Sequence, residues 1–288
     1  IDMANWLVSI QNNDGSFPGG LYFKNKKNKP SIFNSAQIMI GLLSAAKHTK
    51  NDKYYESLEK TGSWLVDNQE RNGTWIKYHY EENFFPSYYT RVAWPILESG
   101  IELNNNSFKK SSIKTFDYIQ KKVLKNGFIK DSGFKPNNPV FLHTIAYTLR
   151  GFLEGAILLK RDDYWKSAYD LSNKFMKKYE IKRTLAGAYS EDLSEFNSYR
   201  CLTGEAQIAI IWMKIYQKSG DYRFLNASSK LLDDICKTQP KRNTFFIKKG
   251  GLMGSKPYFG KYISLRQPNW ATKFFIDALL IEEKLYKI

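Results

Sequence analysis

Five stretches of the chain are apolar over nearly their whole length, and each follows a polar loop that contains glycine. Such all-round apolar segments with interspersed small residues are typical of buried helices. They recur roughly 55 to 65 residues apart, a period typical of helical hairpins that carry one long loop. The segments are FNSAQIMIGLLSAAK from Phe33, YYTRVAWPILESG from Tyr88, LHTIAYTLRGFLEGA from Leu142, CLTGEAQIAIIWMKIY from Cys201 and PNWATKFFIDALLIEE from Pro268.

More polar segments with one apolar stripe alternate with these five. In the second of them Phe116, Ile119 and Val123 fall at helical spacing, and lysines fill the opposite face. The segment Asp2–Gln11 is interpreted as the end of a further helix of this kind. Such helices cover an outer wall. The other predicted outer helices are Tyr54–Gln69, Phe108–Leu124, Asp163–Tyr179 and Asp221–Gln239.

An apolar inner set that alternates with an amphipathic outer set predicts two concentric helical layers. The predicted fold class is therefore all-α, an incomplete (α/α) toroid of about five helical hairpins in a single domain over residues 1–288. Because Ile1 lies inside a predicted helix, we expect the native N-terminus to be missing. The loops from outer to inner helices are long and rich in glycine, asparagine and aromatic residues, so we expect function on that side.

Two loop phrases, IQNNDGSFPGG and NQERNGTW, resemble the Q-x-x-x-G-[ST]-[FW] turns of terpenoid-cyclase and protein-prenyltransferase toroids. The phrases YYTRVAW, LHTIAYTLRGFLE, LTGEAQIAIIW and PNWATKFF resemble uncharacterised toroid proteins found with bacterial surface-polysaccharide genes. The first resemblance implies the fold, and the second implies work on carbohydrate. The chain has neither a Cys/His cluster at zinc spacing nor a D-x-D-D motif, which disfavours prenyltransferase and class II cyclase chemistry.

The net charge of +16 indicates an anionic partner, such as an acidic polysaccharide, nucleic acid or a membrane surface. Basic stretches such as Lys24–Lys29 and Lys177–Arg183 are equally well explained as a solvated face. The predicted partner is an anionic oligo- or polysaccharide and not nucleic acid. No membrane insertion is predicted, since every apolar run is interrupted by charge or glycine. Two cysteines among 288 residues favour a reducing, cytoplasmic location. No metal and no cofactor are predicted, and the oligomeric state is left open.

The helix N-termini at the long-loop side carry the candidate site. His143, Tyr147, Arg91 and Asn34 resemble the residue types that toroid polysaccharide lyases use. Removing the proton next to a uronate carboxylate requires that carboxylate to be neutralised, by an amide or a guanidinium, and requires a base such as neutral histidine. A uronyl epimerase needs nearly the same groups. The structural alternatives are that His143 is a hydrogen-bonded core residue, that Tyr147 packs between inner helices and that Asn34 is a helix N-cap.

The same helix ends supply further substrate-binding candidates, which are Tyr89, Arg200, Asn269 and Trp270, with Asp14 in the first long loop. A glycoside hydrolase needs two carboxyl groups instead. Glu205 with Asp14 or Asp192 is that alternative, because a carboxylate among apolar residues has a raised pKa suited to a general acid. Glu82, Glu191 and Glu195 are other loop carboxylates. Two further alternatives stay open. Glu205 is a buried ion-pair partner of Arg91 or Arg200, or the whole chain has a non-catalytic role as a saccharide-binding or scaffold protein.

Overall fold

The computed structural model describes residues 1–20, 22, 28–81, 83–137, 139–196, 198–244 and 247–287. Glu82 and most of the basic stretch Lys24–Lys29 therefore lie outside the described residues. The inner helices are α2 (Ile32–Thr49), α4 (Thr90–Glu102), α6 (Leu142–Leu159), α8 (Leu202–Ser219) and α10 (Asn269–Tyr286). The outer helices are α1 (Asp2–Ser9), α3 (Asp52–Asp67), α5 (Asn106–Gln120), α7 (Asp162–Lys182) and α9 (Tyr222–Cys236).

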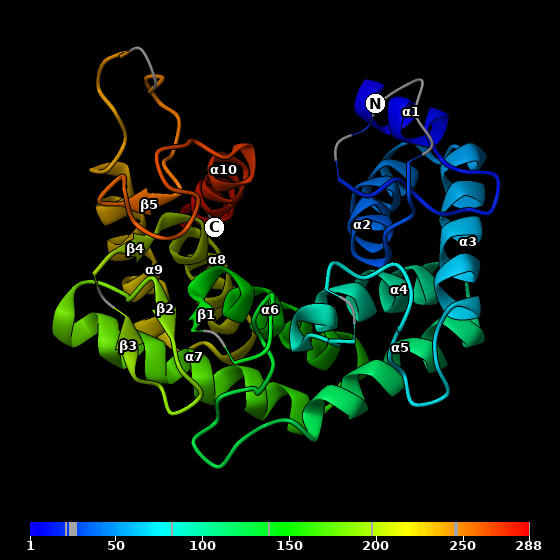
Figure 1. Ribbon diagram of the computed structural model, residues 1–288, viewed down its shortest axis with the longest axis horizontal. Helices are drawn as coiled ribbons and strands as arrows, with labels where there is room; N and C mark the ends of the chain where they lie inside the picture. Colours follow the sequence, from blue (N-terminus) through cyan, green and yellow to red (C-terminus); the bar gives the residue numbers. More distant parts are fainter. Residues whose placement is uncertain are drawn as a thin grey trace.

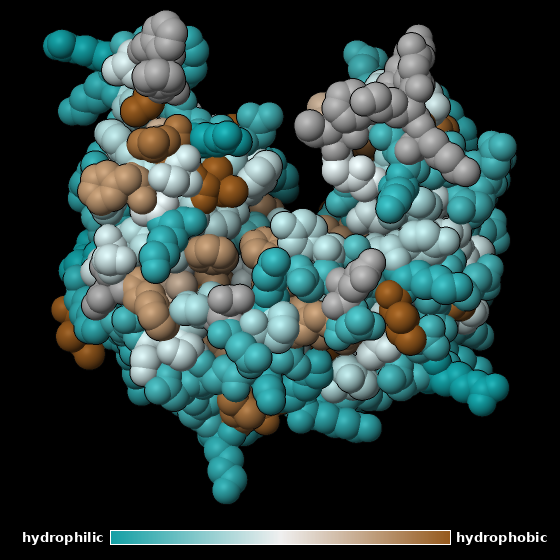
Figure 2. Space-filling view, in the orientation of Figure 1, coloured by the Kyte–Doolittle hydropathy of each residue, from teal (hydrophilic) through white to brown (hydrophobic). Residues whose placement is uncertain are grey.

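The described helices form an open horseshoe in two layers, which confirms the predicted incomplete toroid (Figure 1). Neighbouring inner helices pack in chain order from α2 to α10, and each outer helix lies against its inner partner. The ends of the horseshoe, α1 with α2 and α10 with its preceding loop, face each other across a notch (Figure 2). Among the described residues, no helix is long and apolar enough to cross a membrane.

Short strands lie within the long loops at the N-terminal ends of the inner helices. β1 (Val140–Phe141), β2 (Ala188–Tyr189) and β3 (Glu195–Phe196) form one antiparallel sheet, in which Val140 pairs with Tyr189 and Tyr189 with Glu195. β4 (Arg200–Cys201) pairs with β5 (Ser255–Lys256) in a second sheet. The short 3₁₀ helix η1 (Ser87–Tyr89) leads into α4. These elements fix the long loops over the inner helices and so shape the mouth of the horseshoe.

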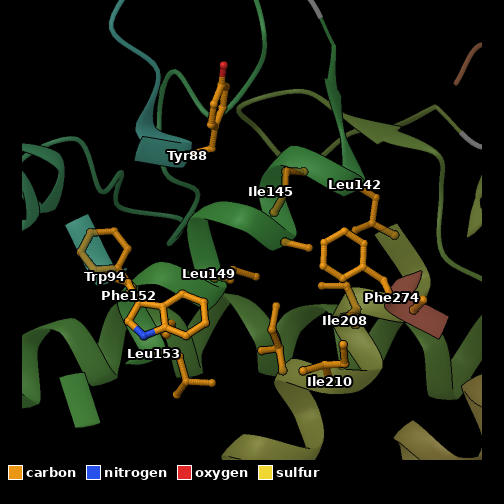
Figure 3. Close-up of a cluster of buried hydrophobic side chains, with 14 of the residues drawn as sticks. Tyr88, Trp94, Leu142, Ile145, Leu149, Phe152, Leu153, Ile208, Ile210 and Phe274 are labelled. Atoms are coloured by element: carbon orange, nitrogen blue, oxygen red, sulfur yellow. The ribbon is translucent and has the colours of Figure 1, made fainter. Parts of the chain in front are cut away.

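Small residues bring the inner helices into close contact. A Cβ on Gly151 of α6 would lie 2.3 Å from the backbone of Thr90, and one on Gly204 of α8 would lie 2.7 Å from the backbone nitrogen of His143. Larger apolar side chains fill the remaining space, as Figure 3 shows for Phe152 of α6 and Phe274 of α10. The inner layer is therefore the rigid part that holds the residues at the mouth.

The two Q-x-x-x-G turns tie α1 to α3 and α3 to α5. Nε2 of Gln69 donates to the carbonyl of Ser111 at 3.1 Å and to the hydroxyl of Thr115 at 2.9 Å, both on α5. Gly73 in the same turn has a φ of +91°, and a Cβ there would lie 2.6 Å from the backbone of α5. Trp75, the last residue of the motif, is 1% exposed, so its ring is buried. Each residue of the motif therefore has a structural role, because the turn needs the donor, the missing Cβ and the buried ring.

Candidate functional site

Three side chains from two inner helices meet near the mouth of the horseshoe. His143 and Tyr147 lie one turn apart on α6, and their ring centroids are 4.3 Å apart. The guanidinium carbon of Arg91, from α4, lies 4.7 Å from the Tyr147 centroid. The structure thus brings together three of the residues that the sequence nominated, although Arg91 is far from the other two along the chain. We call these three residues the Arg91 cluster.

Arg91 is buried among rings instead of carboxylates. Its guanidinium also lies 5.4 Å from the Trp94 ring and 5.5 Å from the Phe274 ring. Nε donates to Oε1 of Gln37 at 2.8 Å, and no described carboxylate lies within ion-pair distance of it. Burial lowers the pKa of Arg91 to about 10, so the group stays charged at neutral pH. A buried cation without a carboxylate partner favours binding of an external anion.

His143 is a neutral imidazole in this setting. It is 4% exposed, and its Nδ1 lies 2.6 Å from Nε2 of Gln207 on α8, which fixes the orientation of the ring. Burial, with the charge of Arg91 as a second cause, lowers the pKa of His143 to about 3. Burial also raises the pKa of Tyr147, while Arg91 acts in the opposite direction. Both groups are therefore uncharged at neutral pH and close to a fixed positive charge.

A cavity of about 420 Å³ lies near the Arg91 cluster, although none of the three cluster residues is among its lining residues. Phe33, which is one of its lining residues, has its ring 5.5 Å from the ring of Tyr147. Asn34 lines the same cavity and donates from Nδ2 to the carbonyl of Pro18 at 3.2 Å. The N-cap of α2 is Ser31, so Asn34 does not serve as the cap. Asn34 is therefore placed to contact a ligand in this cavity.

Tyr89 and Trp270 differ in exposure. Tyr89 lines the same cavity but is 1% exposed, and burial raises its pKa well above the usual value. Trp270 is 45% exposed at the start of α10, and its Nε1 donates to the hydroxyl of Tyr262 at 2.9 Å. The ring of Tyr262 in turn lies 5.3 Å from that of His143. Asn269, next to Trp270, is exposed at the same helix end.

Glu205 and Arg200 are engaged with each other. Nε and Nη2 of Arg200 donate to the two carboxylate oxygens of Glu205 at 2.8 and 2.7 Å. Glu205 is 0% exposed, and burial raises its pKa while the bonds from Arg200 act against this rise. The pair lies between α8 and the segment after α7, where Glu205 also accepts a bond from the backbone of Leu185. The structure thus places Glu205 with Arg200 and not with the Arg91 cluster.

Of the loop carboxylates, Glu195 in β3 pairs with Lys178 and Lys182 at 2.6 and 2.5 Å, whereas Asp14 and Asp192 serve as turn residues. Oδ1 of Asp14 accepts from the backbone and the hydroxyl of Ser16 at 3.0 and 2.6 Å. Asp192 makes the same pair of bonds with Ser194. Asp14 precedes α2 and Asp192 lies in the β2–β3 turn, so neither is paired with Glu205. Among the described residues, no group of three His, Cys, Asp or Glu side chains is arranged to hold a metal ion.

Several residues of the site were not nominated from the sequence. Gln207 orients His143, and Tyr262, Phe134 and Phe274 surround its ring at centroid distances of 5.3, 6.2 and 6.5 Å. Gln207 is a polar residue inside an apolar helix and was detectable on that ground. Phe134 and Tyr262 lie in long loops, where the sequence pattern carries no signal for an inward-facing ring.

No family model matches the sequence, and no curated protein sequence matches it. Solved structures match its fold over almost the whole chain. An unsaturated glucuronyl hydrolase specific for heparin matches with a TM-score of 0.67 and 14% identity, over 99% of this chain and 97% of that one. A D-mannose isomerase matches with a TM-score of 0.73 and 14% identity, over 99% and 82%. A sugar epimerase from a ruminal bacterium matches with a TM-score of 0.70 and 10% identity, over 98% and 83%.

Proposed function

We propose that the protein is a carbohydrate-active enzyme that acts on an anionic, uronate-containing saccharide by lyase- or epimerase-type proton abstraction. The observation that carries the proposal is the Arg91 cluster: a buried guanidinium without a carboxylate partner beside a neutral histidine and a tyrosine. The similarity of fold to a glucuronyl hydrolase, a mannose isomerase and a sugar epimerase supports a saccharide as the substrate.

In the proposed mechanism Arg91 binds the sugar carboxylate and neutralises its charge, which makes the neighbouring C–H more acidic. His143 accepts that proton. Binding itself prepares the base, because a carboxylate paired with Arg91 cancels the positive charge that contributes to the low pKa of His143. In a lyase the C–H electron pair forms a carbon–carbon double bond, the glycosidic C–O bond breaks, and Tyr147 donates its proton to the leaving oxygen. In an epimerase a proton returns to the same carbon from the opposite face, and a group other than Tyr147 must supply it, because the rings of His143 and Tyr147 are in contact on one side of the site.

The geometry favours this function over glycoside hydrolysis. Hydrolysis needs two carboxyl groups on either side of one bond, at most about 10 Å apart. The nominated carboxylates are otherwise engaged, with Glu205 bonded to Arg200 and Asp14 and Asp192 to serines of their own turns. The Arg91 cluster therefore contains no pair of carboxylates of the kind that hydrolysis needs.

The test is incubation of the protein with a panel of acidic glycans. Elimination creates an unsaturated sugar that absorbs in the near ultraviolet, and epimerisation in heavy water places deuterium on the carbon next to the carboxylate. We expect Arg91→Gln and His143→Ala each to reduce kcat/KM by about 10²–10⁴-fold, the usual cost of losing such a group. Asp192→Asn is the matched control, because it alters an exposed turn carboxylate, and we expect it to change nothing.

New reducing ends without absorbance would favour the hydrolase alternative. Binding of the glycan without any product would favour a saccharide-binding or scaffold role. A lyase or epimerase activity that persists in His143→Ala would show that His143 is not the proton acceptor.

A further inference from the structure

A larger cavity, of about 600 Å³, lies next to the Arg91 cluster and is not used by the mechanism above. Its volume falls within the range of about 300–1,000 Å³ that is usual for small-molecule sites. Four long loops contribute to its wall, so segments remote along the chain converge there. Its residues are Tyr80, Gly133, Phe134, Lys135, Pro139, Phe141, Ala188, Phe196, Ser198, Tyr199, Lys261 and Ile263.

The wall of this cavity combines aromatic rings with positive charge. Tyr80 is 77% exposed and Phe196 is 40% exposed, so both rings offer free surface. Lys135 pairs at 3.3 Å with Glu81, which is not among the lining residues, and Lys261 forms no ion pair with any described carboxylate. The described lining includes no Asp or Glu. Exposed rings suit the apolar C–H faces of a sugar, and the lysines suit an acidic substituent.

The cavity adjoins the candidate site. Tyr80 and Phe134 line both this cavity and the one that contains Asn34. The ring of Phe134 lies 6.2 Å from that of His143, so one side chain separates the cavity from the proposed base. Phe141, on another wall, contacts the ring of Tyr262 at 5.3 Å. A chain of sugars with one unit at Arg91 therefore has room for its next unit beyond Phe134.

We propose that this cavity is a second saccharide subsite, which binds the acidic sugar unit adjacent to the one held by Arg91. The inference rests on the proposed function and narrows it, because it makes the substrate an oligo- or polyuronide of at least two units. Phe196 and Tyr80 stack on the second sugar, and Lys261 binds its carboxylate.

The experiment is calorimetric titration with galacturonic acid, its dimer and its trimer. We expect the dimer to bind at least tenfold more tightly than the monomer, and the trimer to add little. Phe196→Ala and Lys261→Ala are expected to remove most of this gain for the dimer and leave monomer binding unchanged. Matched controls are Tyr222→Ala and Lys230→Ala on the outer helix α9, which remove an exposed ring and an exposed lysine far from the mouth. Both controls are expected to keep the full gain.

The outcomes separate the subsite from the proposed function. Equal affinities for monomer and dimer, or a gain that survives both Phe196→Ala and Lys261→Ala, would overturn the subsite alone. Titration with a neutral dimer such as mannobiose tests whether binding requires an acidic sugar. If the neutral dimer binds as tightly as the uronide dimer, and its binding does not depend on Arg91, the substrate class is not acidic and both proposals are overturned. Circular dichroism and thermal unfolding of each variant verify the fold, and Tyr80→Ala repeats the test if Phe196→Ala lowers stability.

Discussion

Replacement of His143 by asparagine is expected to change how stability depends on pH. The folded protein holds His143 with a pKa of about 3, against 6.5 for the unperturbed group. The unfolded chain therefore binds the proton more readily as the solution becomes acidic. The stability that His143 contributes is fully present above pH 6.5 and is lost as the pH falls from 6.5 toward 3. Asparagine does not titrate and keeps an oxygen that accepts a hydrogen bond from Gln207.

The size of this effect follows from the two pKa values. Each pH unit below 6.5 costs about 1.4 kcal/mol until the pH approaches 3. At pH 5 the wild-type protein has therefore lost about 2 kcal/mol through His143, while the His143→Asn variant has lost nothing at this position. Water does not screen the charge that protonation would create, because the side chain is 4% exposed.

The assay is urea unfolding of both proteins at pH 7.5, 6 and 5, followed by tryptophan fluorescence. We expect the difference in free energy of unfolding, wild type minus variant, to fall by about 2 kcal/mol between pH 7.5 and 5. His48→Asn, on the exposed last turn of α2, is the control for removal of a histidine from the surface. A constant difference between wild type and His143→Asn would refute the dry environment on which the assigned neutral state depends.

Further substitutions test the Arg200–Glu205 pair and the glycine-containing turns. Glu205→Ala is expected to lower the free energy of unfolding by about 3 kcal/mol, because it leaves the guanidinium of Arg200 unpaired. The double variant Glu205→Leu with Arg200→Met is expected to recover most of that loss in the same urea assay. Gly73→Ala is expected to lower the free energy of unfolding by more than about 2 kcal/mol, because the new Cβ meets the backbone of α5. Gly220→Ala is expected to lower it by only about 1 kcal/mol, because Gly220 also has a positive φ but has open space around it. Gln69→Ala is expected to cost about 2 kcal/mol in thermal unfolding, through the lost bonds to α5.

The helical layers were predictable because they depend on local periodicity. The apolar segment from Leu142 became α6, and the striped segment from Phe108 became α5, with boundaries shifted by a few residues. The turn at Gln69 was recognisable because its geometry requires a donor, a glycine and a large ring at fixed spacing. What the sequence could not provide was the register between remote segments. Phe134 and Tyr262 reach His143 only because two long loops fold back over the inner helices.

The sequence named the three residues of the Arg91 cluster, but it did not indicate which side chains surround them. Arg91, His143 and Tyr147 were nominated because they are polar residues on apolar helices. Glu205 was nominated on the same ground, yet it lies against Arg200. The sequence offered both readings of Glu205, and periodicity cannot choose between them. The choice depends on which face of α8 points to the mouth and which to the outer layer, and this is set by tertiary packing.

The pairing of charges along the inner helices supports an anionic ligand independently of net charge. Glu154 on α6 is 7% exposed and has two cations, Arg150 at 2.7 Å and Lys214 at 2.8 Å. Burial of a charge is costly unless it is compensated, and here protein groups supply the compensation. Arg91 is equally buried, with rings and the oxygen of Gln37 as its contacts; the charges of Glu154 and Asp277 act on it from farther away, and no described carboxylate lies at ion-pair distance. A cation that the protein leaves without a carboxylate, beside a cavity and two uncharged proton-exchanging groups, is stabilised most by a ligand that brings its own carboxylate.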